Sequence, residues 1–113
     1  MSKDNISNNP YKFLETFLDS VSEIDSYDFD ENDTFDVYFL NEHVEYYSLG
    51  NRFENYIKAK ADDDWEVSRE KYPNEYTVVY KLKDIFRRNR SILFTFFETE
   101  DKSDLTIVVE NIF

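Results

Sequence analysis

The residues of this chain best suited to chemistry are carboxylates, and they are concentrated in one stretch. Residues 13–51 hold eleven of them and no Lys or Arg, whereas the remaining 14 acids and 13 bases nearly cancel. The eleven are Glu15, Asp19, Glu23, Asp25, Asp28, Asp30, Glu31, Asp33, Asp36, Glu42 and Glu45. Two such charges ~6 Å apart in water repel by roughly 0.7 kcal/mol, and physiological salt screens them only partly. Folding gains nothing from this repulsion, so the stretch favours contact with a cationic partner.

Other kinds of site have little support in the sequence. The chain has one His, one Gly and no Cys, which excludes thiolate chemistry, His pairs and Gly-rich phosphate loops. Asp28, Asp30 and Asn32 match the first ligand positions of an EF-hand loop. The match then fails, because that loop needs Gly where Asp33 stands and Glu where Phe39 stands. We therefore expect no enzyme, no cofactor and no dedicated metal site, and at most a weak, non-specific cation site in this loop.

The composition indicates one folded domain over residues 1–113, with residues 1–8 disordered. Hydrophobic residues make up 41% of the chain and aromatic residues 19%, too many for a disordered acidic tail. The polar start carries no secretory signal, and the longest apolar run, residues 92–97, is too short to cross a membrane. We expect a cytoplasmic protein, in the host cell cytoplasm if the chain is viral. The net charge of −12 argues against direct binding to nucleic acid or to anionic lipid.

A first helix is expected over residues 10–24. Asn9 is a suitable N-cap and Pro10 a suitable first helical residue. An apolar face recurs at helical spacing in Phe13, Leu14, Phe17, Leu18, Val21 and Ile24. On another face Glu15, Asp19 and Glu23 recur every four residues, about 6 Å apart along the axis.

The acidic middle of the chain is expected to continue as a loop and a hairpin. Residues 25–34 are too polar and too rich in Asp for an element interior, so they predict a loop. Alternation over residues 35–40 predicts a strand, and a tight turn at residues 41–42 would lead to a second strand over 44–49. After Gly50-Asn51, residues 52–60 suggest a short second helix.

The remainder reads as strands. Residues 65–71 are a weak candidate, and residues 76–82, 92–97 and 105–109 alternate clearly. The sequence thus predicts an α+β fold: an antiparallel sheet of about four to six strands, an N-terminal helix and a short second helix.

Tyrosines interleave with the carboxylates and complete a candidate surface for a partner. A hydroxyl tolerates water, so Tyr27, Tyr38, Tyr46 and Tyr47 are the aromatic residues that we expect to be exposed. Aromatic anchors ringed by charge are typical of interface hot spots. The candidate partner-binding residues are therefore these four tyrosines together with the eleven carboxylates above.

The carboxylate spacing suggests what the partner is. Phosphates of duplex DNA follow one another at ~6–7 Å along each strand, close to the interval of the helical carboxylates. We expect a small stoichiometric inhibitor that mimics nucleic acid and binds a basic, nucleic-acid-binding enzyme or effector complex. Small acidic α+β domains of this type resemble, in type only, phage antidefence proteins such as anti-CRISPR or anti-restriction inhibitors.

Other functions stay open at this point. An immunity protein that neutralises a nuclease toxin would need the same acidic surface. A ligand-binding or enzymatic α+β domain would need a deep apolar cavity instead. A structural subunit with an acidic solubilising face is also compatible with the sequence, as is head-to-tail self-association between acidic and basic poles.

Overall fold

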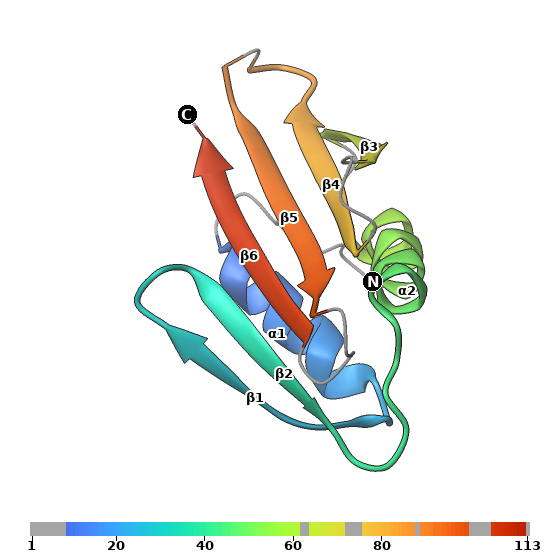
Figure 1. Ribbon diagram of the computed structural model, residues 1–113. Helices are drawn as coiled ribbons and strands as arrows, with labels where there is room; N and C mark the ends of the chain where they lie inside the picture. Colours follow the sequence, from blue (N-terminus) through green and yellow to red (C-terminus); the bar gives the residue numbers. More distant parts are fainter. Residues whose placement is uncertain (1–8, 62–63, 72–75, 88, 100–104, 113) are drawn as a thin grey trace.

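The structure, a computed structural model, describes residues 9–61, 64–71, 76–87, 89–99 and 105–112. Within them it contains two helices and one antiparallel sheet of six strands, which confirms the predicted fold class (Figure 1). In chain order the elements are α1 (Pro10–Ser20), β1 (Ile24–Asp30), β2 (Thr34–Phe39), α2 (Tyr46–Lys60), β3 (Trp65–Lys71), β4 (Thr77–Asp84), β5 (Ser91–Glu98) and β6 (Leu105–Ile112). The expected disorder of residues 1–8 falls outside the described residues.

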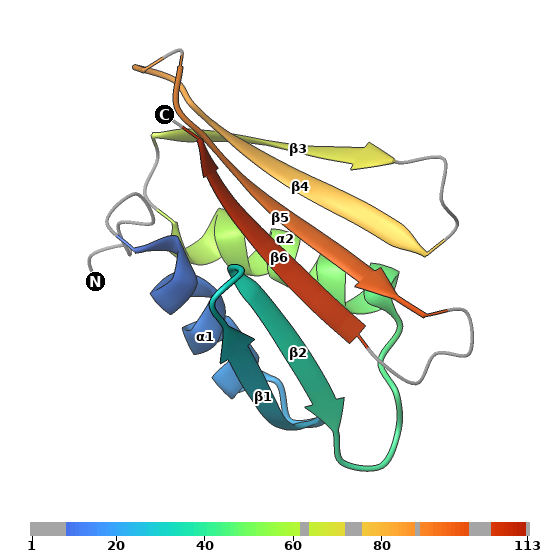
Figure 2. The same ribbon diagram turned by 60° about the vertical axis from the view of Figure 1, so that its left-hand side comes forward.

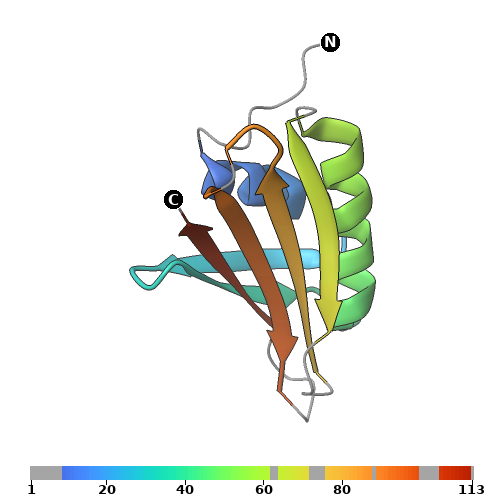
Figure 3. The same cartoon turned by 90° about the horizontal axis from the view of Figure 1, so that it is seen from above.

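The sheet runs in the order β1–β2–β6–β5–β4–β3. Four of its pairings join strands that follow one another along the chain, whereas the fifth joins β2 to β6, with Thr34 opposite Val108. Both helices lie on the same side of the sheet (Figures 2 and 3). No described helix covers the other side, which we call the outer face. The β1–β2 hairpin is strongly rotated relative to β3, β4 and β5 (Figure 3).

Helix α1 starts as predicted and ends earlier. The Asn9 side chain accepts a hydrogen bond from the Lys12 backbone N–H at 3.0 Å, and Pro10 occupies the first turn. The prediction that the helix continues to Ile24 is wrong, because Val21 is already extended and Ile24 begins β1. Both side chains still pack against the core, so they keep the apolar spacing of a helix after the helix has ended.

Two further predictions are corrected in the acidic middle of the chain. Residues 25–34, expected to be a loop, form most of β1 and the turn into β2. The expected hairpin at residues 41–42 and the strand over 44–49 are absent from these described residues, since α2 begins at Tyr46. Leu49 belongs to the helix and lies one turn before Phe53 and two before Ile57, all three buried.

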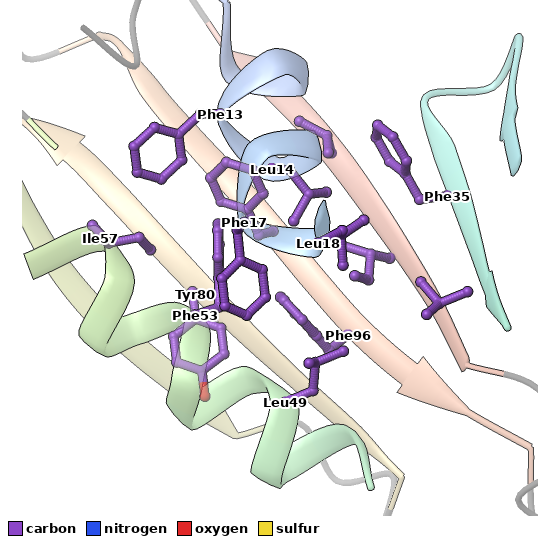
Figure 4. Packing of buried hydrophobic residues seen from close by; sticks show 14 of the residues in the cluster. Phe13, Leu14, Phe17, Leu18, Phe35, Leu49, Phe53, Ile57, Tyr80 and Phe96 are labelled. Atoms are coloured by element: carbon purple, nitrogen blue, oxygen red, sulfur yellow. The ribbon is translucent and has the colours of Figure 1, made fainter. Parts of the chain in front are cut away.

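The core lies between the helices and the inner face of the sheet. Aromatic rings fill much of it: Phe53 packs against Phe17 at 5.0 Å and against Phe94 at 4.8 Å between ring centroids. Figure 4 shows Phe53 and Phe17 meeting from the two helices above β4 and β5. The predicted inward residues of the last strand, Leu105, Ile107 and Val109, are all buried.

Gly50 marks a tight contact in this core rather than the end of an element. It lies inside α2, and a Cβ atom added to it would stand 2.6 Å from the Tyr80 hydroxyl oxygen. The helix passes this close to β4 only because position 50 has no side chain.

Candidate functional site

The acidic stretch is organised around the β1–β2 hairpin. Its strands are in register so that Asp28 lies directly opposite Asp36, and Phe29 lies opposite Phe35. Side chains alternate across a strand, so Phe35, which is buried in the core, points inward and Asp28 and Asp36 share the outer face. Two like charges therefore face each other across the hairpin, an arrangement that opposes strand pairing.

The hydrogen-bond pattern fixes how close these two residues are. The Val109 N–H donates to the Asp33 carbonyl at 2.9 Å, so residue 33 directs its backbone groups toward β6. Alternate residues of a strand bond to opposite neighbours, so Asp36 directs its backbone groups toward β1 and forms a hydrogen-bonded pair with Asp28. Their Cα atoms are thus about 5.5 Å apart.

The hairpin turn, residues 31–33, adds exposed charge and is held by its own side chains. An Asp30 carboxylate oxygen accepts a hydrogen bond from the Asn32 N–H at 2.8 Å. Asp33 has a φ of 58°, a left-handed conformation that Asp tolerates better than most residues. Asp30, Glu31 and Asp33 are all exposed, so the tip carries three charges within four residues.

Two tyrosines tie α1 to this hairpin. The Tyr27 hydroxyl donates to Asp19 at 2.9 Å; burial, followed by this bond and by the negative charges of Asp19 and Glu15, raises the pKa of Tyr27 to about 12. Burial and a hydrogen bond to Asp33 raise the pKa of Tyr11 as well. Glu15 and Asp19 of the helix therefore lie beside the inner face of β1.

Glu23 is separated from this group and is neutralised within the chain. It follows the end of α1, and its two carboxylate oxygens accept hydrogen bonds from Arg52 of α2 at 3.0 and 2.6 Å. This pairing with Arg52, together with hydrogen bonds from its own backbone N–H and from Ser22, lowers the pKa of Glu23 to about 2. The predicted row of Glu15, Asp19 and Glu23 is therefore divided: Glu15 and Asp19 lie together on α1 near Tyr27, whereas Glu23 pairs with Arg52 of α2.

The other candidate residues lie toward the base of the hairpin. Asp25 is exposed at a bulge in β1, and Glu42 is exposed in the connection from β2 to α2. Glu45 precedes α2 and is partly buried. Because β2 spans six residues, about 20 Å, Glu42 and Glu45 are distant from the hairpin tip.

Of the four tyrosines predicted to be exposed, two are exposed and two are partly buried. Tyr38, on the outer face of β2, is 42% exposed, and Tyr47, at the start of α2, is 51% exposed. Tyr27 and Tyr46 are partly buried and pack against the core. Sequence reasoning missed Phe29, which is 45% exposed at the edge of the sheet although its ring stacks on Phe35 at 4.6 Å.

A second exposed feature that sequence reasoning missed lies in the β4–β5 connection. Phe86 is 75% exposed and Ile85 is 53% exposed. An Asp84 carboxylate oxygen accepts from the N–H groups of Phe86 and Arg87 at 2.8 and 3.0 Å, which orders the turn that presents them. No pattern in the sequence separates these two residues from core residues, because alternation ends just before them.

The described residues offer little that would suit a metal site, a ligand pocket or a membrane span. His43 contacts the buried Glu98 carboxylate at 2.5 Å, and no group of three or more potential metal ligands occurs in the described part of the chain. Two open depressions adjoin α2. One, of about 530 Å³, includes Arg52 of α2, and the other, of about 480 Å³, lies between α2 and Arg69 of β3; neither is a deep apolar cavity. No helix in the described ranges is long and apolar enough to span a membrane.

Comparisons with protein-family models, with curated proteins and with solved structures find no match to this chain.

Proposed function

We propose that this protein is a small stoichiometric inhibitor that mimics nucleic acid and binds the basic nucleic-acid-binding surface of another protein. The observation that carries the proposal is the direct opposition of Asp28 and Asp36. This pair costs folding free energy rather than contributing to it, and Lys or Arg of a partner would remove the cost. Asp36 has a role within the fold, because its carboxylate accepts a hydrogen bond from the Thr106 hydroxyl of β6 at 3.2 Å. The charge that a role outside folding would explain is therefore that of Asp28.

The spacing of charge on the hairpin suits a phosphate-binding surface. Asp28 and Asp30 point to the same face two residues apart, about 6.8 Å along an extended strand. Consecutive phosphates on a DNA strand are separated by a similar ~6–7 Å. Asp36 on the next strand and the exposed Glu31 in the turn add two further charges near this pair. Such a surface would also steer a cationic partner toward it and speed association.

The biological setting that fits this mechanism is antidefence, with a CRISPR effector or a restriction enzyme as the target. In that role the hairpin would occupy the groove in which Lys and Arg normally hold phosphates. The exposed Tyr38 on the outer face would add apolar contact area beside the charges.

The test is affinity capture from a lysate of the native host with the wild type and two variants. Asp28→Lys/Glu31→Lys reverses two hairpin charges while leaving Asp30 and Asp33, which shape the turn, intact. Glu66→Lys/Glu70→Lys makes the same change in net charge at exposed positions of β3, the strand at the opposite edge of the sheet, and serves as the control.

The wild type and the control are expected to recover a nucleic-acid-binding protein that competing duplex DNA or RNA displaces. The hairpin variant is expected to lose it. Equal recovery by both variants, or recovery that nucleic acid does not compete with, would contradict the proposal.

A further inference from the structure

Strand β1 leaves one backbone edge of the sheet open, and its acidic residues flank that edge. β1 is the terminal strand in the sheet order, and no described element pairs with its far side (Figures 1 and 3). Asp28 and Asp30 direct their backbone groups toward β2, because they pair with residues 36 and 34. The intervening residues, Tyr27 and Phe29, therefore direct their N–H and C=O groups outward, where another strand could bond to them.

Carboxylates lie on both sides of this open edge. On the outer face are the side chains of Asp28 and Asp30, both exposed. On the inner face are Glu15 and Asp19 of α1, held beside β1 through the Tyr27 hydroxyl. Phe29 also points inward, yet it is 45% exposed, since no described element lies on the far side of β1. The edge thus combines unpaired backbone groups, an apolar ring and negative charge.

We propose, building on the proposed function, that an extended segment of the basic partner adds to β1 as a seventh strand. Its outer-face side chains opposite Asp28 and Asp30 would be Lys or Arg. The residue between them would point inward, next to Phe29, and would be apolar. The recognised segment is therefore a basic–apolar–basic strand, in which backbone bonds give affinity and the two charges fix the register.

A second copy of this chain is a poor occupant of the same edge. Pairing two β1 strands would bring Asp28 and Asp30 of one copy against the same residues of the other, and charges on edge strands are a common defence against such pairing. The opposite edge of the sheet, β3, carries charges of both signs, including Glu66 and Arg69, and offers no such preference.

Amide hydrogen exchange read by NMR tests this directly. The probe is the heptapeptide Thr-Lys-Val-Lys-Val-Lys-Thr, blocked at both ends, and the control peptide has Glu in place of Lys. At 90% occupancy the Tyr27 and Phe29 amides should exchange about tenfold more slowly, since a strand bonded to them protects them only while it is bound. The Glu peptide should leave both rates unchanged. The reference amides are those of Val67 and Arg69, which face the open edge of β3 by the same alternation.

Three results would overturn the added strand. One is protection of the Tyr27 and Phe29 amides in the free protein, which would mean that the edge is already occupied. Another is equal slowing at the β3 reference amides. The third is a Lys peptide that shifts the side-chain signals of Asp28 and Asp30 but leaves the edge amides unprotected. In that last case the acidic surface and the proposed function would stand, and only the strand addition would fail.

Discussion

Neutralising Asp28 should stabilise the fold, which is the opposite of what most substitutions do. Its carboxylate faces that of Asp36 across the hairpin, with Cα atoms about 5.5 Å apart. Two charges at that separation in water repel by roughly 0.75 kcal/mol. This is an upper value, because the Asp36 carboxylate accepts a hydrogen bond from Thr106 of β6, on the side of β2 away from Asp28. Screening leaves about 0.4 kcal/mol in 150 mM salt and about 0.6 kcal/mol in 10 mM salt, where the Debye length is 30 Å. Asp28→Asn should therefore raise the free energy of unfolding by up to these amounts.

The measurement is urea unfolding of the wild type, Asp28→Asn and Asp25→Asn at both salt concentrations. Asp25 is the matched control because it lies in the same strand, at the bulge, with no residue paired to it in the register. Subtracting its effect removes the general benefit of lowering a net charge of −12 and leaves the contribution of the facing pair. The same Asn substitution should weaken capture of the proposed cationic partner.

A clear result would refute this reasoning. If Asp28→Asn is no more stable than Asp25→Asn at low salt, then the two facing carboxylates do not repel measurably. The charge pair would then have no folding cost for a partner to relieve, and the central support for the proposed function would be lost.

Three further outcomes follow from contacts elsewhere. Gly50→Ala should lower the free energy of unfolding in urea by up to about 2 kcal/mol, because overpacking against Tyr80 costs roughly 1 to 3 kcal/mol and the gain in helix propensity returns only about 1 kcal/mol; unchanged or higher stability would show that the ring can shift. Arg52 holds the pKa of Glu23 at about 2, below its ordinary 4.5, so the wild type should lose its stability advantage over Glu23→Gln as pH falls from 4.5 to 2 in thermal unfolding. If the difference in melting temperature between the wild type and Glu23→Gln stays constant from pH 4.5 to 2, the pairing of Glu23 with Arg52 is contradicted. The pKa of Tyr27 is raised to about 12 from 10, so its stabilisation is complete below pH 10 and should disappear as pH rises to 12. Ultraviolet titration should therefore show a late-ionising tyrosine that Tyr27→Phe lacks, and identical titration curves would refute it.

The strands that bury one face were predictable from the sequence. In residues 92–97 and 105–109 the apolar side chains alternate, and a wrong register would expose all of them at once. Strand β1 was not predictable in this way, because an edge strand tolerates Asp on its exposed side and then resembles a loop. Gly50 misled the reading of α2, since only the contact with Tyr80 from a distant strand explains a glycine there.

The candidate site was predictable in composition but not in geometry. The excess of carboxylates can be counted from the sequence, but the facing of Asp28 and Asp36 depends on the register of a hairpin that the sequence did not indicate. Likewise, the pairing of Glu23 with Arg52 joins a residue of the acidic stretch to one that follows it, 29 positions further along the chain, and local spacing says nothing about such a contact. A charge pattern in the sequence can therefore suggest the charge of a proposed partner, whereas the residues that would contact it depend on the fold.

The pairing of β2 with β6 affects how the protein is made. Thr34 and Val108 become neighbours only after more than 70 intervening residues have been synthesised, and closing so long a loop costs roughly 4 kcal/mol of chain entropy. During translation the hairpin strands lack this support until β6 has left the ribosome. A chain that stops before β6 would therefore carry the whole acidic stretch without the scaffold that arranges it, so the acidic surface takes its final form only late in synthesis.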